Sequence, residues 1–280
     1  MPRPSPARGP PMVDAEAIIW HDLPVIDTTC RPPMPLDSAH LVAIAATFVA
    51  AFVRGFTGFG SALIFMPLAS AAFSPQLAAP VLLITDFILG IPLVVAAFRE
   101  VRWRTVLPAA IAAILTTPLG AHALAHGDPL ILRWAISAIV LALLILLMSG
   151  WRYPGEPQPL PSLGVGAAAG FLGGIGQVSG PPVVAYWIGG PDKTTVIRAN
   201  LFCFFAVISL SSFAAYLWNG LYSSEVIDLF LLLAPVYAIA LGIGALVFRR
   251  TAGAAYRPFA YAVIALAVLT SMPVFDGLLG

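Results

Sequence analysis

An arginine, three glycines and a serine lie within eight residues, in the stretch Arg54-Gly55-Phe56-Thr57-Gly58-Phe59-Gly60-Ser61. These residue types suit the binding of a small oxyanion. Glycine lets backbone N–H groups approach a ligand closely, and a helix that begins after the glycines directs its positive dipole end at that ligand. Arg54 would supply a counter-charge and Ser61 a hydroxyl donor. The candidate binding residues of this stretch are Arg54, Gly58, Gly60 and Ser61.

A second glycine-rich stretch, Gly173-Gly174-Ile175-Gly176-Gln177-Val178-Ser179-Gly180-Pro181-Pro182, has the same character. Its side-chain donors are Gln177 and Ser179, and its two prolines are expected to fix the backbone and begin the next helix. The alternative is a packing role, because Gly-x-x-x-Gly spacings bring helices together without binding a ligand. Both roles can coexist. The candidate binding residues here are Gly176, Gln177, Ser179, Gly180 and Pro181.

Three further polar residues carry hypotheses. Asp86 is an acid deep inside a predicted span, where such residues relay protons or pair with a donor on a neighbouring helix, and both interpretations stay open. Arg54 has the alternative of extending its side chain to the membrane interface. Arg198 and Asn200 are secondary candidates that could reach the second glycine-rich stretch, and a solvated helix end is the alternative for Arg198.

The composition sets the class of protein. The 280 residues are 60% hydrophobic and 10% charged, whereas a soluble domain carries about 25% charged residues. We therefore predict an all-α polytopic protein of the cell membrane. A formal net charge of +1 gives no reason to expect nucleic-acid binding. The two cysteines, Cys30 and Cys203, indicate neither a disulfide framework nor a metal cluster.

Apolar windows of the length that crosses a bilayer are Leu77 to Phe98, Thr105 to Leu124, Leu130 to Ser149, Thr195 to Trp218, Val226 to Phe248 and Tyr256 to Val274. The apolar run from Ser38 to Phe73 is too long for one straight span, since it would measure about 54 Å against a core of about 30 Å. Split at its glycines, it gives two pieces of about 15 residues, each too short to cross comfortably. The run from Leu160 to Ile188 divides in the same way. We predict two broken or re-entrant helical hairpins, whose irregular backbone must be buried or line a cavity.

The chain also repeats itself: Gly58-Phe59-Gly60 aligns with Gly174-Ile175-Gly176, Gly120 with Gly242, and Arg133 with Arg257. This predicts a first membrane repeat over 38–150, a linker over 151–159 and a second repeat over 160–275. A proline-rich disordered tail over 1–37 precedes them and a short tail over 276–280 follows. If both hairpins enter and return, the repeats are inverted, and one face then collects Arg99, Arg102, Arg104, Arg152, Lys193, Arg198, Arg249, Arg250 and Arg257. Such a bias is what the positive-inside rule predicts for the cytoplasmic face.

The sequence Arg-Gly-Phe-Thr-Gly-Phe-Gly followed by Met66-Pro67-Leu68, together with the later Gly-Gly-Ile-Gly-Gln-Val-Ser-Gly-Pro-Pro-Val-Val, resembles the paired signature of the sulfite exporter TauE/SafE family. The resemblance covers about residues 40–275. It implies about eight helices in two related halves and the export of sulfite or small organosulfur anions. The chain departs from the glycine-richest form of the motif at Ser61 and Gln177.

We therefore expect a secondary transporter that exports a small anion, either sulfite or an organosulfur or sulfonate compound, by alternating access around the two glycine-rich breaks. Its partners would be the anion and the lipid bilayer, and we expect no cofactor, no metal site and no catalytic residue. Two alternatives stay open. An intramembrane enzyme would need a nucleophile with a base or a metal cluster, and a membrane partner subunit would have no transport activity of its own.

Overall fold

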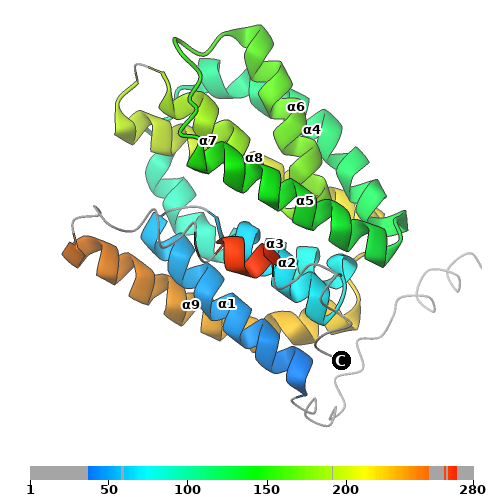
Figure 1. The fold of residues 1–280 in the computed structure, drawn as a ribbon. Helices are drawn as coiled ribbons and strands as arrows, with labels where there is room; N and C mark the ends of the chain where they lie inside the picture. The colour runs from blue at the N-terminus through cyan, green and yellow to red at the C-terminus, as the bar shows by residue number, and fades with distance from the viewer. Residues whose placement is uncertain (1–36, 58–59, 191, 252–261, 263, 270–280) are drawn as a thin grey trace, which may run out of the picture. The chain divides into compact units, whose positions relative to one another are not determined.

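The computed structural model describes residues 37–57, 60–190, 192–251, 262 and 264–269, and these residues are helical except in short connections. The nine helices that it bounds are α1 (Ser38–Thr57), α2 (Ser61–Ala72), α3 (Pro75–Ala97), α4 (Trp103–His126), α5 (Pro129–Met148), α6 (Pro159–Gly176), α7 (Gly180–Ile188), α8 (Thr194–Trp218) and α9 (Ser224–Thr251) (Figure 1). Residues 264–269 are helical as well.

Five of the six predicted spans are confirmed as α3, α4, α5, α8 and α9. The sequence caps them in the ordinary way. Ser74 accepts a hydrogen bond from the Leu77 N–H at the start of α3, and Asp128 accepts two at the start of α5, with a proline in the first turn of each helix. Most of the sixth predicted span lies outside the described residues, as do the predicted tails over 1–37 and 276–280, except for Asp37.

The first glycine-rich run is a re-entrant hairpin, as predicted. Its two arms, α1 and α2, are joined at Gly60, whose φ of 96° is left-handed and favours glycine. The arms run back alongside each other, because His40 at the start of α1 contacts Phe73 at the end of α2, with ring centroids 5.3 Å apart. The chain therefore leaves the hairpin at the end where it entered.

The second run folds in the same manner around Gln177, which is also left-handed at φ 58°. Here the Ser162 hydroxyl, near the start of α6, lies 2.9 Å from the Tyr186 hydroxyl, near the end of α7. The predicted equal arms of about 15 residues are wrong. The arms measure 20 and 12 residues in the first hairpin and 18 and 9 in the second, because each break lies late in its apolar run.

The two hairpins open at opposite ends of the helices. The first opens beside the α2–α3 connection, which Gln76 ties to the α4–α5 connection through a 3.0 Å hydrogen bond from its Nε2 to the Gly127 carbonyl. The second opens at the end where Arg102 of the α3–α4 connection pairs with Asp192 of the α7–α8 connection. We call this second end the arginine-rich end. The basic residues at this end whose side chains the structure describes are Arg99, Arg102, Arg104, Arg152, Lys193 and Arg198.

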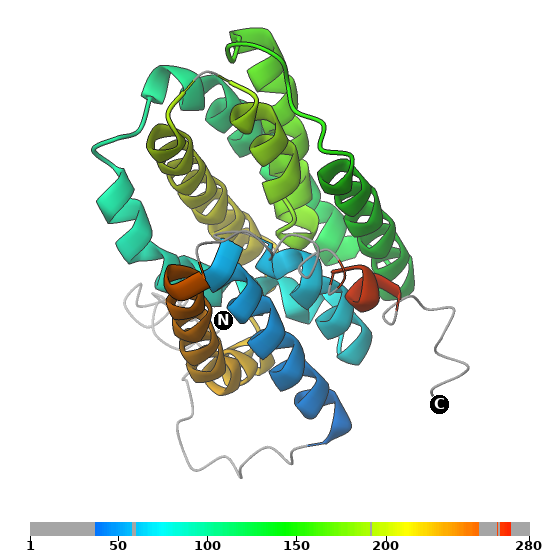
Figure 2. The same ribbon diagram turned by 60° about the vertical axis from the view of Figure 1, so that its left-hand side comes forward.

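The helices pack across the two predicted halves. The most extensive contacts are those of α6 with α4 and of α1 with α9. Helices α1 and α9 lie side by side in both ribbon views (Figure 1 and Figure 2). Glycine makes these contacts close. A Cβ added at Gly170 would lie 2.4 Å from the Ala113 carbonyl oxygen, and one added at Gly55 would lie 2.2 Å from the Leu241 carbonyl oxygen. In each of these pairs, the first helix of one predicted half packs against a later helix of the other half, as two related halves would require. The repeat itself stays a prediction.

Candidate functional site

An ion pair lies where the first hairpin turns. Arg54 stands in the last turn of α1, and Asp86 is the middle residue of α3. The guanidinium Nη1 lies 2.9 Å from the Asp86 carboxylate Oδ2, and the two side chains are only 20% and 21% exposed. Arg54 thus turns toward a buried acid on a neighbouring helix. A largely buried charge is tolerated when it is paired and hydrogen-bonded in this way.

Two hydroxyl groups complete the surroundings of Asp86. Tyr237, in the middle of α9, donates a hydrogen bond to Oδ1, and Ser61, the first residue of α2, donates a 3.4 Å hydrogen bond to Oδ2. Both hydroxyl residues are 1% exposed. Side chains from four helices of both predicted halves therefore meet at one carboxylate. Sequence reasoning missed Tyr237, and the only available signal was a polar tip at the centre of an apolar span.

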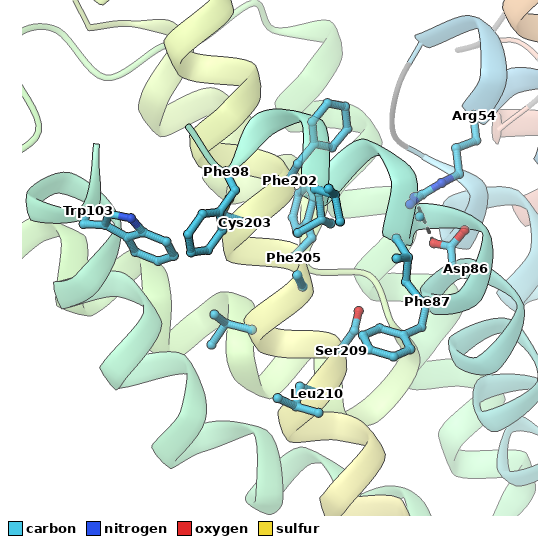
Figure 3. A pocket seen from close by; sticks show the side chains of 16 residues that line it. Arg54, Asp86, Phe87, Phe98, Trp103, Phe202, Cys203, Phe205, Ser209 and Leu210 are labelled. Carbon is cyan, nitrogen blue, oxygen red and sulfur yellow. Dashed lines mark ion pairs between the residues drawn. The ribbon is translucent and has the colours of Figure 1, made fainter. Parts of the chain in front are cut away.

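A cavity of about 310 Å³ leads away from this ion pair between α3, α8 and the start of α4. Arg54 and Asp86 lie at one end, and Phe98 and Trp103 lie at the other, next to the arginine-rich end (Figure 3). The walls between these ends are almost entirely apolar. The aromatic rings of Phe87, Phe202 and Phe205 contribute to them, and the polar side chains along α8 are those of Cys203 and Ser209.

The second break is closed by its own hydrogen bonds. The Gln177 Nε2 donates to the Gly173 carbonyl at 2.8 Å and to the Tyr216 hydroxyl at 3.1 Å, and the Tyr216 hydroxyl donates to the Gly174 carbonyl at 2.8 Å. The Gly173 carbonyl also accepts the backbone hydrogen bond from the Gln177 N–H, and the Tyr216 hydroxyl satisfies the Gly174 carbonyl at the end of α6. Ser179 is buried and precedes α7, which begins at Gly180 with Pro181 in its first turn, as predicted.

The structure brings together Arg54, Ser61 and Asp86 among the predicted site residues, with Gly60 forming the turn between α1 and α2. Gly58 lies outside the described residues. The predicted residues of the second break are not among those that line the described cavity. These residues are Gly176, Gln177, Ser179, Gly180 and Pro181.

The two secondary candidates lie near the arginine-rich end. Asn200 is buried and accepts a 2.8 Å hydrogen bond from the Arg102 backbone N–H, so its amide oxygen binds the α3–α4 connection and not the glycines of the second break. Arg198 is exposed, and its guanidinium carbon lies 5.8 Å from the centre of the Phe202 ring. Arg198 therefore lies at an exposed helix end, which is the alternative considered above, and not beside the glycines.

Seven of the described helices are long and apolar enough to cross a membrane, judged by length and composition. Searches of curated proteins and of solved structures found no match. A family model described as "Sulfite exporter TauE/SafE" matches residues 43–271, which is most of the chain. The match spans both hairpins and the helices around the Arg54–Asp86 pair. This multi-pass membrane protein therefore belongs to the sulfite exporter TauE/SafE family of membrane transporters.

Proposed function

We propose that this protein is a secondary transporter that exports a small anion, either sulfite or an organosulfur anion such as a sulfonate. The observation that carries the proposal is the position of Arg54. It places a guanidinium at the inner end of a cavity and near the middle of the helices, at the tip of a re-entrant hairpin. An anion at this depth needs such a counter-charge, because an uncompensated charge away from water costs several kcal/mol or more.

The cavity favours an organosulfur anion with an apolar body over sulfite. Its volume of about 310 Å³ is at the lower end of the range of roughly 300–1,000 Å³ for sites that hold small organic molecules. Sulfite has only a few atoms and carries charge on all of its oxygens, so it would leave the aromatic walls without a partner. A sulfonate could direct its oxygens at Arg54 and place its carbon skeleton against Phe87, Phe202 and Phe205.

Alternating access would use the two hairpins. The cavity approaches the Arg54–Asp86 pair from the arginine-rich end, so the described state would be open toward that end and closed toward the other. The first hairpin brings Arg54 and Ser61 to the site. The second hairpin packs against the first, since a Cβ at Gly176 would contact Met66 of α2 as well as Ile136 of α5. A binding role for the second break stays part of the proposal, with its glycines allowing the rearrangement.

Flux of radiolabelled anions into proteoliposomes tests the function. We expect saturable transport, with benzenesulfonate half-saturating at lower concentration than methanesulfonate and sulfite. Gly90 lines the cavity one turn after Asp86, and a Cβ there meets no atom within 4 Å, so Gly90→Leu would fill the cavity without disturbing the helix packing. This variant should raise the half-saturation concentration for benzenesulfonate about tenfold or more through steric overlap, and that for methanesulfonate much less.

Gly164→Leu is the matched control, because Gly164 is exposed on α6, its Cβ also meets nothing within 4 Å, and it does not line the cavity. Equal transport of all three anions by the Gly90→Leu variant and wild type would contradict the assignment of the cavity. No flux of any anion in either direction would instead favour a membrane enzyme or a partner subunit.

The proposed orientation places the arginine-rich end in the cytoplasm, following the positive-inside rule. In a variant without native cysteines, a cysteine replacing the exposed Arg99 should react with a membrane-permeant maleimide but not with an impermeant one added outside intact cells. A cysteine replacing the exposed His126, at the other end of α4, should react with both reagents. The reverse pattern would invert the orientation and with it the direction in which the cavity opens.

A further inference from the structure

Three side-chain donors from different helices converge on the Asp86 carboxylate. They are the Arg54 guanidinium, the Ser61 hydroxyl and the Tyr237 hydroxyl. A guanidinium with two hydroxyl donors is the set of groups that a sulfonate or carboxylate would require. We propose that Asp86 acts as an internal substitute for the transported anion, so that the substrate binds by taking over these donors, with Tyr237 among its binding residues. The inference rests on the proposed anion transport.

The position of Asp86 makes its carboxylate compete with an incoming anion for the Arg54 guanidinium. The carboxylate lines the same cavity as Arg54, so an anion arriving along the cavity meets a guanidinium that is already paired. If both anions stayed ionised beside one guanidinium, the site would hold an excess negative charge away from water, which is unfavourable. Binding therefore requires Asp86 to give up its charge or leave the site.

No other described charge is placed to relieve this conflict. The helices packed against α3 are α2, α4, α5, α6, α8 and α9. Of these, α2 and α9 contribute the hydroxyl groups of Ser61 and Tyr237 that bind Asp86. Helix α8 contributes the Cys203 and Ser209 side chains, which line the cavity. The other charged residues of these helices stand within about two turns of a helix end, and they include Arg104, His122, His126, Arg133, Arg198, Glu225 and Asp228.

Protonation of Asp86 resolves the competition. One proton from the water that enters the cavity adds to the carboxylate, Arg54 loses its ionic partner, and the guanidinium becomes free for the incoming anion. The loaded site then holds one anion and one added proton, and releasing the anion returns the proton. A carrier of this kind moves a proton together with each anion, so the net direction of flux follows the combined gradients of both.

Tyr237 distinguishes this arrangement from an ion pair that only stabilises the fold. Its hydroxyl donates a hydrogen bond to the Asp86 carboxylate, and its side chain is buried between the helices. When the protonated Asp86 no longer needs a donor, the Tyr237 hydroxyl can donate to the substrate instead. Its removal should weaken anion binding without removing the proton dependence, whereas removal of the Asp86 charge should remove that dependence.

Benzenesulfonate binding to the full-length protein in lipid nanodiscs, measured by calorimetry between about pH 5.5 and 8.5, tests the inference. A sulfonate keeps its charge over this range, whereas sulfite itself titrates. Where Asp86 is ionised, the wild-type Kd should rise about tenfold per pH unit, with uptake of one proton per anion. Asp86→Asn should bind with a Kd independent of pH and without proton uptake. Tyr237→Phe should bind about tenfold more weakly with the pH dependence retained.

Tyr186→Phe is the matched control, since Tyr186 is equally buried and hydrogen-bonded but lies at the mouth of the second hairpin. Its Kd should equal that of wild type. Proton uptake by a folded Asp86→Asn variant, or equal affinities of the two tyrosine variants, would overturn the inference while leaving anion transport intact. Absence of binding of benzenesulfonate, methanesulfonate and sulfite by folded wild-type protein would remove the proposed function and this inference together.

Discussion

Replacing Arg54 with glutamine should lower the affinity for benzenesulfonate by roughly 100-fold, because the anion loses its charge-assisted hydrogen bonds and its counter-charge together. The same change leaves Asp86 buried without its cationic partner, with only the Tyr237 and Ser61 hydroxyls as donors. Breaking a buried pair in this way costs about 3–5 kcal/mol of stability. The single variant should therefore lose both binding and thermal stability, measured by calorimetry and by thermal unfolding in detergent.

A double variant separates the two effects. Arg54→Gln with Asp86→Asn replaces the ion pair by two neutral amides of similar shape, which can hydrogen-bond to each other, so stability should return most of the way to wild type. The affinity for benzenesulfonate should stay roughly 100-fold below that of wild type. Arg152→Gln is the control for the substitution, because Arg152 is exposed in the α5–α6 connection and should be neutral in both measurements. Wild-type affinity for benzenesulfonate in a stable double variant would show that Arg54 is not the counter-charge.

The sequence was sufficient to predict the membrane class, five spans and the two hairpins, because hydropathy and glycine breaks are local signals. The lengths of the hairpin arms were not predictable in the same way. Gly55 reads as part of the break, yet it is helical in α1 because its missing side chain lets α1 pack against the Leu241 carbonyl of α9. A helical glycine that serves such a contact is indistinguishable in sequence from a glycine that interrupts a helix.

The site was only partly predictable for a related reason. Arg54 and Asp86 stood out because charges are rare inside apolar spans, but nothing in the sequence indicated that they form a pair. That contact depends on how α1 and α3 pack. Tyr237 gave no charge signal, and Asn200 looked like a site residue although its amide oxygen binds the Arg102 backbone. Pairing across 32 to 151 positions of the chain is a property of the fold, which neither periodicity nor spacing reports.

The second large effect concerns the packing of α6 on α4. A Cβ at Gly166 would lie 2.1 Å from the Ala109 carbonyl oxygen and 2.5 Å from the Ala109 Cα, both of which belong to the backbone of α4 and cannot turn aside. Gly166→Val would have to push the two helices apart along a contact that relies on close backbone approach. We expect a loss of roughly 3 kcal/mol or more, seen as little or no monodisperse protein after detergent extraction and a strongly lowered unfolding temperature.

Gly164→Val on the same helix is the matched control. Its added Cβ meets no atom within 4 Å, and its position is exposed, so the same substitution should change little beyond helix propensity, within about 1 kcal/mol. The comparison separates a structural glycine from a functional one. The Gly166 variant should lose transport because it does not fold, whereas the double variant at Arg54 and Asp86 should fold and still lose transport. Equal yield and stability of the two glycine variants would show that α4 and α6 do not depend on this close approach.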